Sequence, residues 1–176
     1  MDIFAHTLWA AVGAKGLNGA LHRRASSVGW TAFLGVVPDF FAFGLTFLAA
    51  LPSLFSGDGF HRSSLSGLPH ELYNYSHSLV IWAAVFLLVW AIRKKPWLPL
   101  FGWALHILID IPSHVISFYP TPFLFPLSEY RFPYGIPWSN KWYMIINYTL
   151  LAVVWIYILI RYIRKRQAQK YLSSKI

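Results

Sequence analysis

Cysteine is absent from the 176 residues of this chain. The protein therefore has no disulfide framework, no thiolate metal ligand and no cysteine nucleophile. Any metal ion would have to be bound by histidine and carboxylate side chains. The same absence leaves the redox state of its compartment undetermined.

Charged residues are also scarce, at 12% of the chain against about 25% in soluble domains. Hydrophobic residues make up 57% and aromatic residues 19%. This composition predicts a membrane protein with a single membrane-embedded domain over residues 1–176. We expect an all-α, polytopic helix bundle.

Apolar segments set the expected number of helices in this bundle. Four segments approach the ~20 residues that cross a bilayer as a helix: residues 30–54, 76–92, 97–118 and 142–162. A fifth, residues 3–21, is less apolar because it carries His6, Lys15 and Asn18. It is expected to span, to re-enter or to lie at the interface. The prediction is a bundle of about five helices.

Basic residues give the chain a net charge of +9. Eleven of the 15 lie in three clusters: Arg23 and Arg24; Arg93, Lys94 and Lys95; and Arg161, Arg164, Lys165, Arg166, Lys170 and Lys175. If all five segments span, these clusters share one side, and the positive-inside rule places the N-terminus outside and the C-terminus in the cytoplasm. Residues 161–176 are then a basic cytoplasmic tail that contacts anionic lipid. No nucleic-acid partner is expected.

Two connections break the helical pattern. Residues 56–75 are rich in glycine and polar side chains, which is typical of turns rather than of helix. Residues 119–141 contain five prolines interleaved with aromatic side chains. The prolines exclude a regular helix, and the aromatics suit the headgroup layer, so this loop is expected on the membrane surface.

Two further prolines fall inside the predicted spans, each beside a carboxylate: Pro38 precedes Asp39, and Pro112 follows Asp110 by two residues. Proline removes a backbone donor and frees the carbonyl four residues earlier. Irregular backbone at membrane depth is tolerated where it lines a cavity. Both positions therefore indicate a polar pocket.

The segment around residues 102–114 carries the most informative spacing. His106 and Asp110 are four residues apart, so they share one helical face. Ionisable groups at membrane depth are costly and mark functional sites. At about 1.5 Å per residue, Asp39 and His77 fall in the same layer. His6 joins this layer if the first segment crosses the membrane.

Three histidines and two aspartates form a donor set suited to zinc, with manganese or iron as alternatives. A carboxylate can bridge two ions, so we expect one or two, with Asp110 as the bridge. Asp39 and Asp110 are the predicted catalytic carboxylates. An alternative remains open, in which the His106 and Asp110 pair is a hydrogen bond that locks helix packing.

Three other residues are weaker candidates for the same site. His114 could be a ligand or a proton shuttle, but Pro112 prevents projection of its helical face. Glu71 lies in a polar loop, where solvent exposure is the default. Arg131 could hold a substrate phosphate, since arginine makes bidentate contacts to oxyanions, or it could be a surface arginine.

The chain resembles a group of bacterial inner-membrane proteins described as membrane-bound metal-dependent hydrolases. The resemblance runs to about Trp155. Its blocks are Met1-Asp-Ile-Phe-Ala-His6, Gly35-Val-Val-Pro38-Asp39, Tyr75-Ser76-His77-Ser78-Leu79, Gly102-Trp-Ala-Leu-His106-Ile-Leu-Ile-Asp110 and Pro120-Thr-Pro-Phe-Leu-Phe-Pro126. It implies a location in the bacterial inner membrane.

The order of these residues is also distantly similar to the zinc-dependent phospholipase C and single-strand nuclease superfamily. That resemblance implies one zinc on four ligands: Asp39, His77, His106 and Asp110. It implies a second zinc on His6 and the shared Asp110.

The function expected from these patterns is a membrane-embedded hydrolase in which metal-activated water attacks a lipid-like phosphoester. Membrane lipid would be both its surroundings and its substrate. Two rivals are a non-catalytic metal carrier or sensor and a membrane scaffold. The sequence names no protein partner.

Overall fold

A computed structural model of the chain describes residues 1–56 and 67–173. These residues form seven α-helices, one 3₁₀ turn and no β-strand. The elements in chain order are α1 (Ile3–Ala20), α2 (Val28–Leu34), α3 (Val37–Ser56), α4 (Leu68–Ser76), α5 (Leu79–Arg93), η2 (Leu98–Leu100), α6 (Phe101–Ser113) and α7 (Lys141–Ser173).

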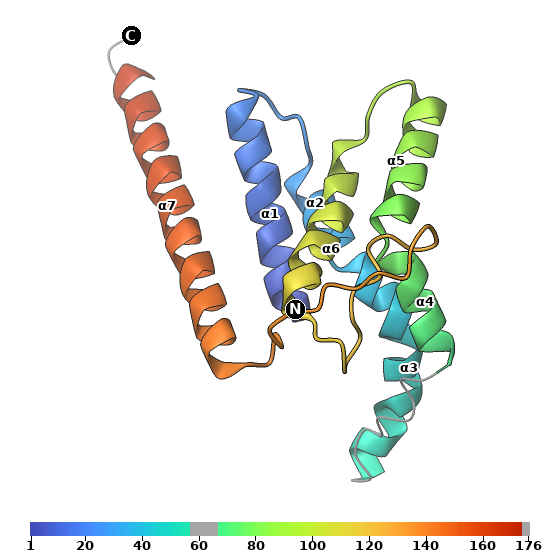
Figure 1. The fold of residues 1–176 in the computed structure, drawn as a ribbon. Coiled ribbons are helices and arrows are strands. Elements are labelled where there is room, and N and C mark those ends of the chain that lie inside the picture. The colour runs from blue at the N-terminus through green and yellow to red at the C-terminus, as the bar shows by residue number, and fades with distance from the viewer. Residues whose placement is uncertain (57–66, 174–176) are drawn as a thin grey trace.

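Helices α1, α2 and α6 pack together at the centre of the molecule, with α5 beside α6 and α4 against α3 (Figure 1). Small residues allow this close packing. The buried face of α1 is rich in alanine, and a Cβ on Gly102 of α6 would overlap the carbonyl group of Thr31 in α2. Contacts between small residues let helix backbones approach closely in a bilayer, where the hydrophobic effect does not drive helices together.

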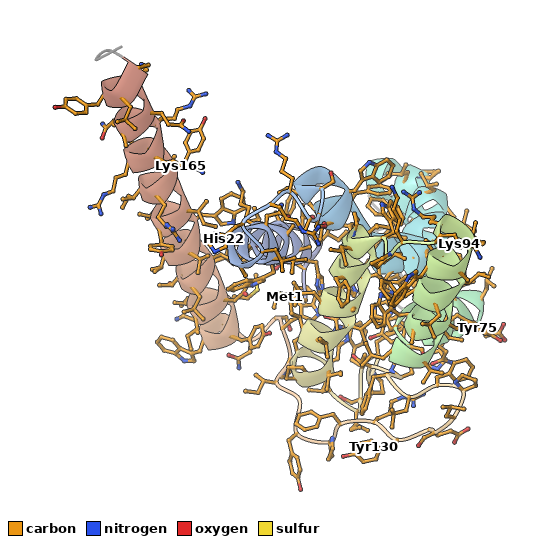
Figure 2. The ribbon with its side chains drawn as sticks, turned by 90° about the horizontal axis from the view of Figure 1, so that it is seen from above. Met1, His22, Tyr75, Lys94, Tyr130 and Lys165 are labelled. Carbon is orange, nitrogen blue, oxygen red and sulfur yellow. The ribbon has the colours of Figure 1, made fainter. Side chains whose placement is uncertain are left out.

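Helix α7 stands at one side of the other helices, as the view from above shows (Figure 2). Its most extensive packing is with α1. This packing includes a hydrogen bond of 2.8 Å from Trp9 Nε1 to Asn147 Oδ1. Most of the remaining α7 surface is apolar and exposed, as expected of a helix that faces lipid.

The expected five spans are found only in part. By length and composition, α7 alone is a clear candidate to cross a membrane, and the count rises to three if each of two bent helix pairs is one span. The pairs are α2 with α3, bent by 50°, and α4 with α5, bent by 59°. Helix α1 fails the same test because its polar residues lower its hydropathy, and α6 is too short.

Both predicted irregular connections can be compared with the structure. Residues 114–140 contain no helix, which confirms that the proline-rich segment interrupts the helical pattern. Its position at the membrane surface stays a prediction. The prediction for residues 56–75 was wrong at its end, because α4 begins at Leu68. Pro69 lies in the first turn of α4, where proline is compatible with a helix. Residues 57–66 of this connection lie outside the described part.

The predicted proline breaks differ in kind. The chain bends at Gly35 and Val36, and Pro38 lies in the first turn of α3 rather than inside one continuous helix. Pro112 lies in the last turn of α6, which ends at Ser113 instead of running to residue 118. Each proline therefore sits at a helix end.

The ends of α1, α5 and α7 that precede or carry the basic clusters lie toward one end of the molecule (Figure 1). Residues 161–173 of the predicted tail continue α7 as helix. The N-terminus lies at the end of α1 that faces away from the C-terminus of the chain (Figure 1). This arrangement agrees with clusters that share one side.

Candidate metal centre

Breaks in the helices place the side chains of the candidate site. Asp39 lies in the first turn of α3, and His77 is the residue at which α4 ends before α5 begins. His106 and Asp110 lie one turn apart on α6. The hydroxyl of Ser78 caps α5 by accepting hydrogen bonds from the amides of Val80 and Ile81. This cap holds the α4–α5 break, and hence His77, in position.

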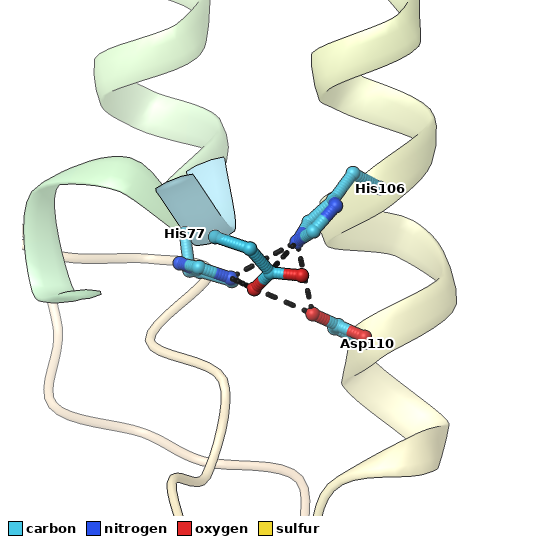
Figure 3. Close-up of side chains that lie close together, drawn as sticks. His77, His106 and Asp110 are labelled. Carbon is cyan, nitrogen blue, oxygen red and sulfur yellow. Dashed lines mark hydrogen bonds and ion pairs between the residues drawn. The ribbon is translucent and has the colours of Figure 1, made fainter. Parts of the chain in front are cut away.

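Four side chains converge on one point: Asp39, His77, His106 and Asp110. Their potential ligand atoms all lie within 4.8 Å of one another. His106 Nε2 is 3.1 Å and His77 Nε2 is 3.5 Å from Asp110 Oδ2. Asp39 Oδ1 is 3.5 Å from His77 Nε2 and 3.7 Å from His106 Nε2. Figure 3 shows His77 and His106 directed toward the carboxylate of Asp110.

The Nδ1 atoms of His77 and His106 are already hydrogen-bonded. His106 Nδ1 lies 2.7 Å from the Gly35 carbonyl, which can only accept, so this nitrogen donates. His77 Nδ1 lies 2.9 Å from Ser76 Oγ, which is itself 3.4 Å from the Tyr73 carbonyl. The two Nε2 atoms lie 3.0 Å apart. Hydrogen bonds of this kind at Nδ1 orient histidine ligands in metal sites and leave Nε2 for the ion.

His6 adds a third ring to this group. It stacks on His106 with 3.6 Å between ring centroids, and its Nε2 lies 3.0 Å from Asp110 Oδ1. Among the described residues, His6 Nδ1 has no hydrogen-bond partner, although the ring is buried. The close polar contacts of His6 Nε2 and Asp110 Oδ2 are with other members of this group. Unpartnered buried polar atoms are costly, and a bound cation would satisfy them.

Asp110 is the centre of the arrangement. Its Oδ2 faces His77 and His106, and its Oδ1 faces His6 and His114, with His114 Nε2 at 3.5 Å. His114 Nδ1 donates to the Tyr119 carbonyl at 2.8 Å, so its Nε2 carries the lone pair, and the Met1 amino group lies 3.3 Å from this Nε2. Both oxygens of the carboxylate thus face imidazoles, and Oδ1 also accepts hydrogen bonds from the Met1 amino group at 2.5 Å and from the Ser113 hydroxyl at 3.3 Å. A carboxylate that faces ligands on both oxygens can bridge two ions.

The other two predicted candidates lie apart from this cluster. Glu71 is exposed on α4. Arg131 lies in the 114–140 loop and donates a hydrogen bond to the Tyr130 carbonyl at 3.3 Å.

Some contacts at the cluster had no clear signal in the sequence. The Tyr73 ring stacks on His77 at 3.8 Å between centroids, and these residues are four apart on α4. Helical spacing would have found this pair had the segment been predicted as a helix. The amino group of Met1 also lies 2.5 Å from Asp110 Oδ1.

A cavity of about 360 Å³ adjoins the cluster. Asp39 and His114 contribute to its wall, together with aromatic side chains that include Phe43, Tyr119 and Trp138. Partial burial raises the pKa of the Tyr119 phenol, so its hydroxyl stays protonated. The cavity therefore joins a polar end to a largely apolar wall.

The donor set suits a divalent metal ion of borderline hardness. Two imidazoles and two carboxylates can supply four ligands, as zinc takes in proteins, and the same set suits manganese or iron. The group is buried except for Asp39, whose side chain is 14% exposed and borders the cavity. A ligand in the cavity can therefore reach the cluster from the side of Asp39.

Comparison with known proteins gives one match, to a family model described as YdjM inner membrane protein, over residues 1–170. No curated protein and no solved structure matches the chain. The family description names a membrane and no activity. It therefore supports the predicted membrane location and gives no support to the predicted hydrolase activity. The matched range contains every residue of the cluster, and the chain belongs to the YdjM inner membrane protein family.

Proposed function

We propose that this protein is a metal-dependent hydrolase that cleaves a lipid-like phosphoester within the membrane. The observation that carries the proposal is the convergence of Asp39, His77, His106 and Asp110 within 4.8 Å, beside a cavity with an apolar wall. The first feature suits a divalent ion, and the second suits a substrate with a hydrocarbon part. Zinc is the favoured ion.

A divalent ion held by these ligands would polarise a phosphoryl oxygen and lower the pKa of water toward about 7. The residues of the chain supply the rest. Asp39 borders the cavity and is positioned to accept a proton. His114 lies at the same wall, and its Nε2 lone pair can take up a proton and then pass it to the departing oxygen. The aromatic wall excludes bulk water and packs against acyl chains.

Metal analysis of the purified full-length protein tests the first half of the proposal. We expect stoichiometric zinc, manganese or iron in the wild type, and its loss in His106→Ala and in Asp110→Ala. His70→Ala is a matched control, because His70 lies on α4 and is exposed. Wild-type protein without stoichiometric metal would refute both the hydrolase and the carrier interpretations and leave the scaffold.

Turnover tests the second half. Metal-loaded protein in micelles is supplied with a phosphodiester bearing a long acyl chain and with its short-chain analogue. Hydrolysis that favours the long-chain compound and is lost in Asp39→Asn is expected. Stoichiometric metal without hydrolysis of either compound would favour a carrier or sensor.

A further inference from the structure

A second polar cavity lies between the C-terminal end of α1 and helix α7, away from the His/Asp cluster. Its volume is about 560 Å³. Its lining includes Arg23 and Arg24, which follow α1, and Arg161 and Lys165 of α7. Figure 2 labels His22 and Lys165 on the two elements that border it. At about 1.5 Å per residue, the length of α1 separates it from His6 by more than 20 Å.

The backbone that presents Arg23 is held in a defined shape. His22 has a left-handed conformation with φ of 51°. The amide of His22 donates to the Gly19 carbonyl, and the amide of Arg23 donates to the Asn18 carbonyl, each at 3.2 Å. These are the two hydrogen bonds of a Schellman cap. The last carbonyls of α1 are therefore engaged within the chain.

The side chain of Asn18 fixes the far side of the same turn. Its Nδ2 donates to the Ser26 carbonyl, and its Oδ1 accepts from the Ser26 amide, both at 2.7 Å. The arginines at positions 23 and 24 thus lie on a short loop that is tied at both ends. A tied loop loses less conformational entropy when a ligand binds than a free one does.

The charge of this cavity is not balanced by the described part of the chain. Four cationic side chains contribute to its wall. Every ion pair of the described residues involves Asp39 or Asp110, in the distant cluster. The Arg161 guanidinium lies against the Tyr157 ring, 5.8 Å from its centroid. An anionic ligand would contact several positive groups, and no described carboxylate forms an ion pair with them.

The surroundings of the cavity indicate the source of the anion. Ile156, Tyr157 and Ile160 of α7 lie within one to two turns of Arg161 and expose 44% to 58% of their surface. The helix is apolar enough to cross a membrane. A ligand with a phosphate in the cavity and hydrocarbon along α7 satisfies both surfaces at once.

We infer that this cavity binds the phosphate of an anionic phospholipid, whose acyl chains lie on the exposed apolar face of α7. The site is independent of the proposed hydrolytic activity, because it shares no residue with the His/Asp cluster. Arginine suits the role, since its guanidinium makes bidentate hydrogen bonds to phosphate oxygens.

The test compares two double variants of the full-length protein in detergent, each of which removes two positive charges. Arg23→Gln/Arg161→Gln alters the cavity. Arg93→Gln/Lys95→Gln alters the basic cluster after α5, which lies outside it. Binding of phosphatidylglycerol, phosphatidylcholine and inorganic phosphate is measured by native mass spectrometry and by the rise in unfolding temperature.

We expect wild-type protein to retain phosphatidylglycerol in preference to phosphatidylcholine. At about five-fold per basic side chain near an anionic headgroup, the cavity variant should lose about 25-fold in affinity, and the control variant less than about two-fold. Equal losses in both variants would show general surface attraction and overturn the site. Equal retention of the two lipids, or equal stabilisation by inorganic phosphate, would overturn the lipid assignment. If the cavity variant unfolds before lipid is added, the test is repeated with Lys165→Gln, which changes an exposed side chain on α7.

Discussion

Gly35 offers a sharp test of how the helices position the cluster. It lies in the break between α2 and α3, in right-handed helical backbone with φ of −69°, so alanine is compatible with its conformation. A Cβ there would lie 2.6 Å from Ala10 Cβ and 3.2 Å from the His6 carbonyl oxygen. Because carbon atoms normally pack about 3.5 to 4.0 Å apart, Gly35→Ala must separate α1 from the break by about 1 Å.

This shift acts on the cluster through two connections. The Gly35 carbonyl accepts the hydrogen bond of His106 Nδ1 at 2.7 Å, and Ala10 lies one helical turn after His6. Overpacking of this kind costs about 1–3 kcal/mol of stability. Metal ligands tolerate displacements of about 0.2 Å, and loss of a hydrogen bond that orients a histidine ligand lowers metal affinity by about 10–100-fold. We expect zinc affinity to fall within that range.

Zinc titration and thermal unfolding in micelles, with and without zinc, measure both effects. Gly16→Ala is the control, because a Cβ at this position in α1 meets nothing within 4 Å and alanine favours helix by up to about 1 kcal/mol. The expected order of unfolding temperature is Gly16→Ala at or above wild type, and Gly35→Ala below it. A Gly35→Ala protein with wild-type unfolding temperature and zinc affinity would refute the reasoning.

Three other measurements test separate features. Asn147→Leu removes the acceptor of Trp9 Nε1 and should lower the free energy of unfolding by about 1–3 kcal/mol; an unchanged denaturant midpoint would contradict this link between α1 and α7. Tyr73→Phe removes a 3.0 Å hydrogen bond to a loop carbonyl and keeps the ring stacked on the cluster, so it should cost about 1 kcal/mol with zinc affinity within two-fold; a larger loss of affinity would give the hydroxyl a role at the ion. Single cysteines at the exposed Leu127 and Leu172 should react with an impermeant thiol reagent from opposite sides of the membrane; labelling from one side would contradict the predicted orientation.

The spacing of His106 and Asp110 predicted their shared face because both lie within one regular helix. The depth argument also placed Asp39 and His77 in the same layer, although it counted residues along continuous spans and both residues lie at helix breaks. Neither argument could set the direction of a side chain. The orientation of His106 depends on the Gly35 carbonyl, 71 residues earlier in the chain.

Two differences from the prediction have local causes. Helix α4 was missed because Pro69 and its polar neighbours were interpreted as turn signals, although proline suits the first turn of a helix. The position of His114 could not be projected past Pro112. The 114–140 loop decides it, through the hydrogen bond from His114 to the Tyr119 carbonyl.

The cluster draws its members from α1, α3, the α4–α5 break and α6. Helices in a bilayer gain little from hydrophobic contact with one another, since lipid is equally apolar. An ion bound by Asp39, His77, His106 and Asp110 would hold α3, the α4–α5 break and α6 together in place of that missing drive. At a free ion concentration 1,000 times the dissociation constant, binding adds about 4 kcal/mol to the free energy of unfolding. Assembly of the bundle would then follow the supply of metal, so depletion would loosen the helices as well as empty the centre.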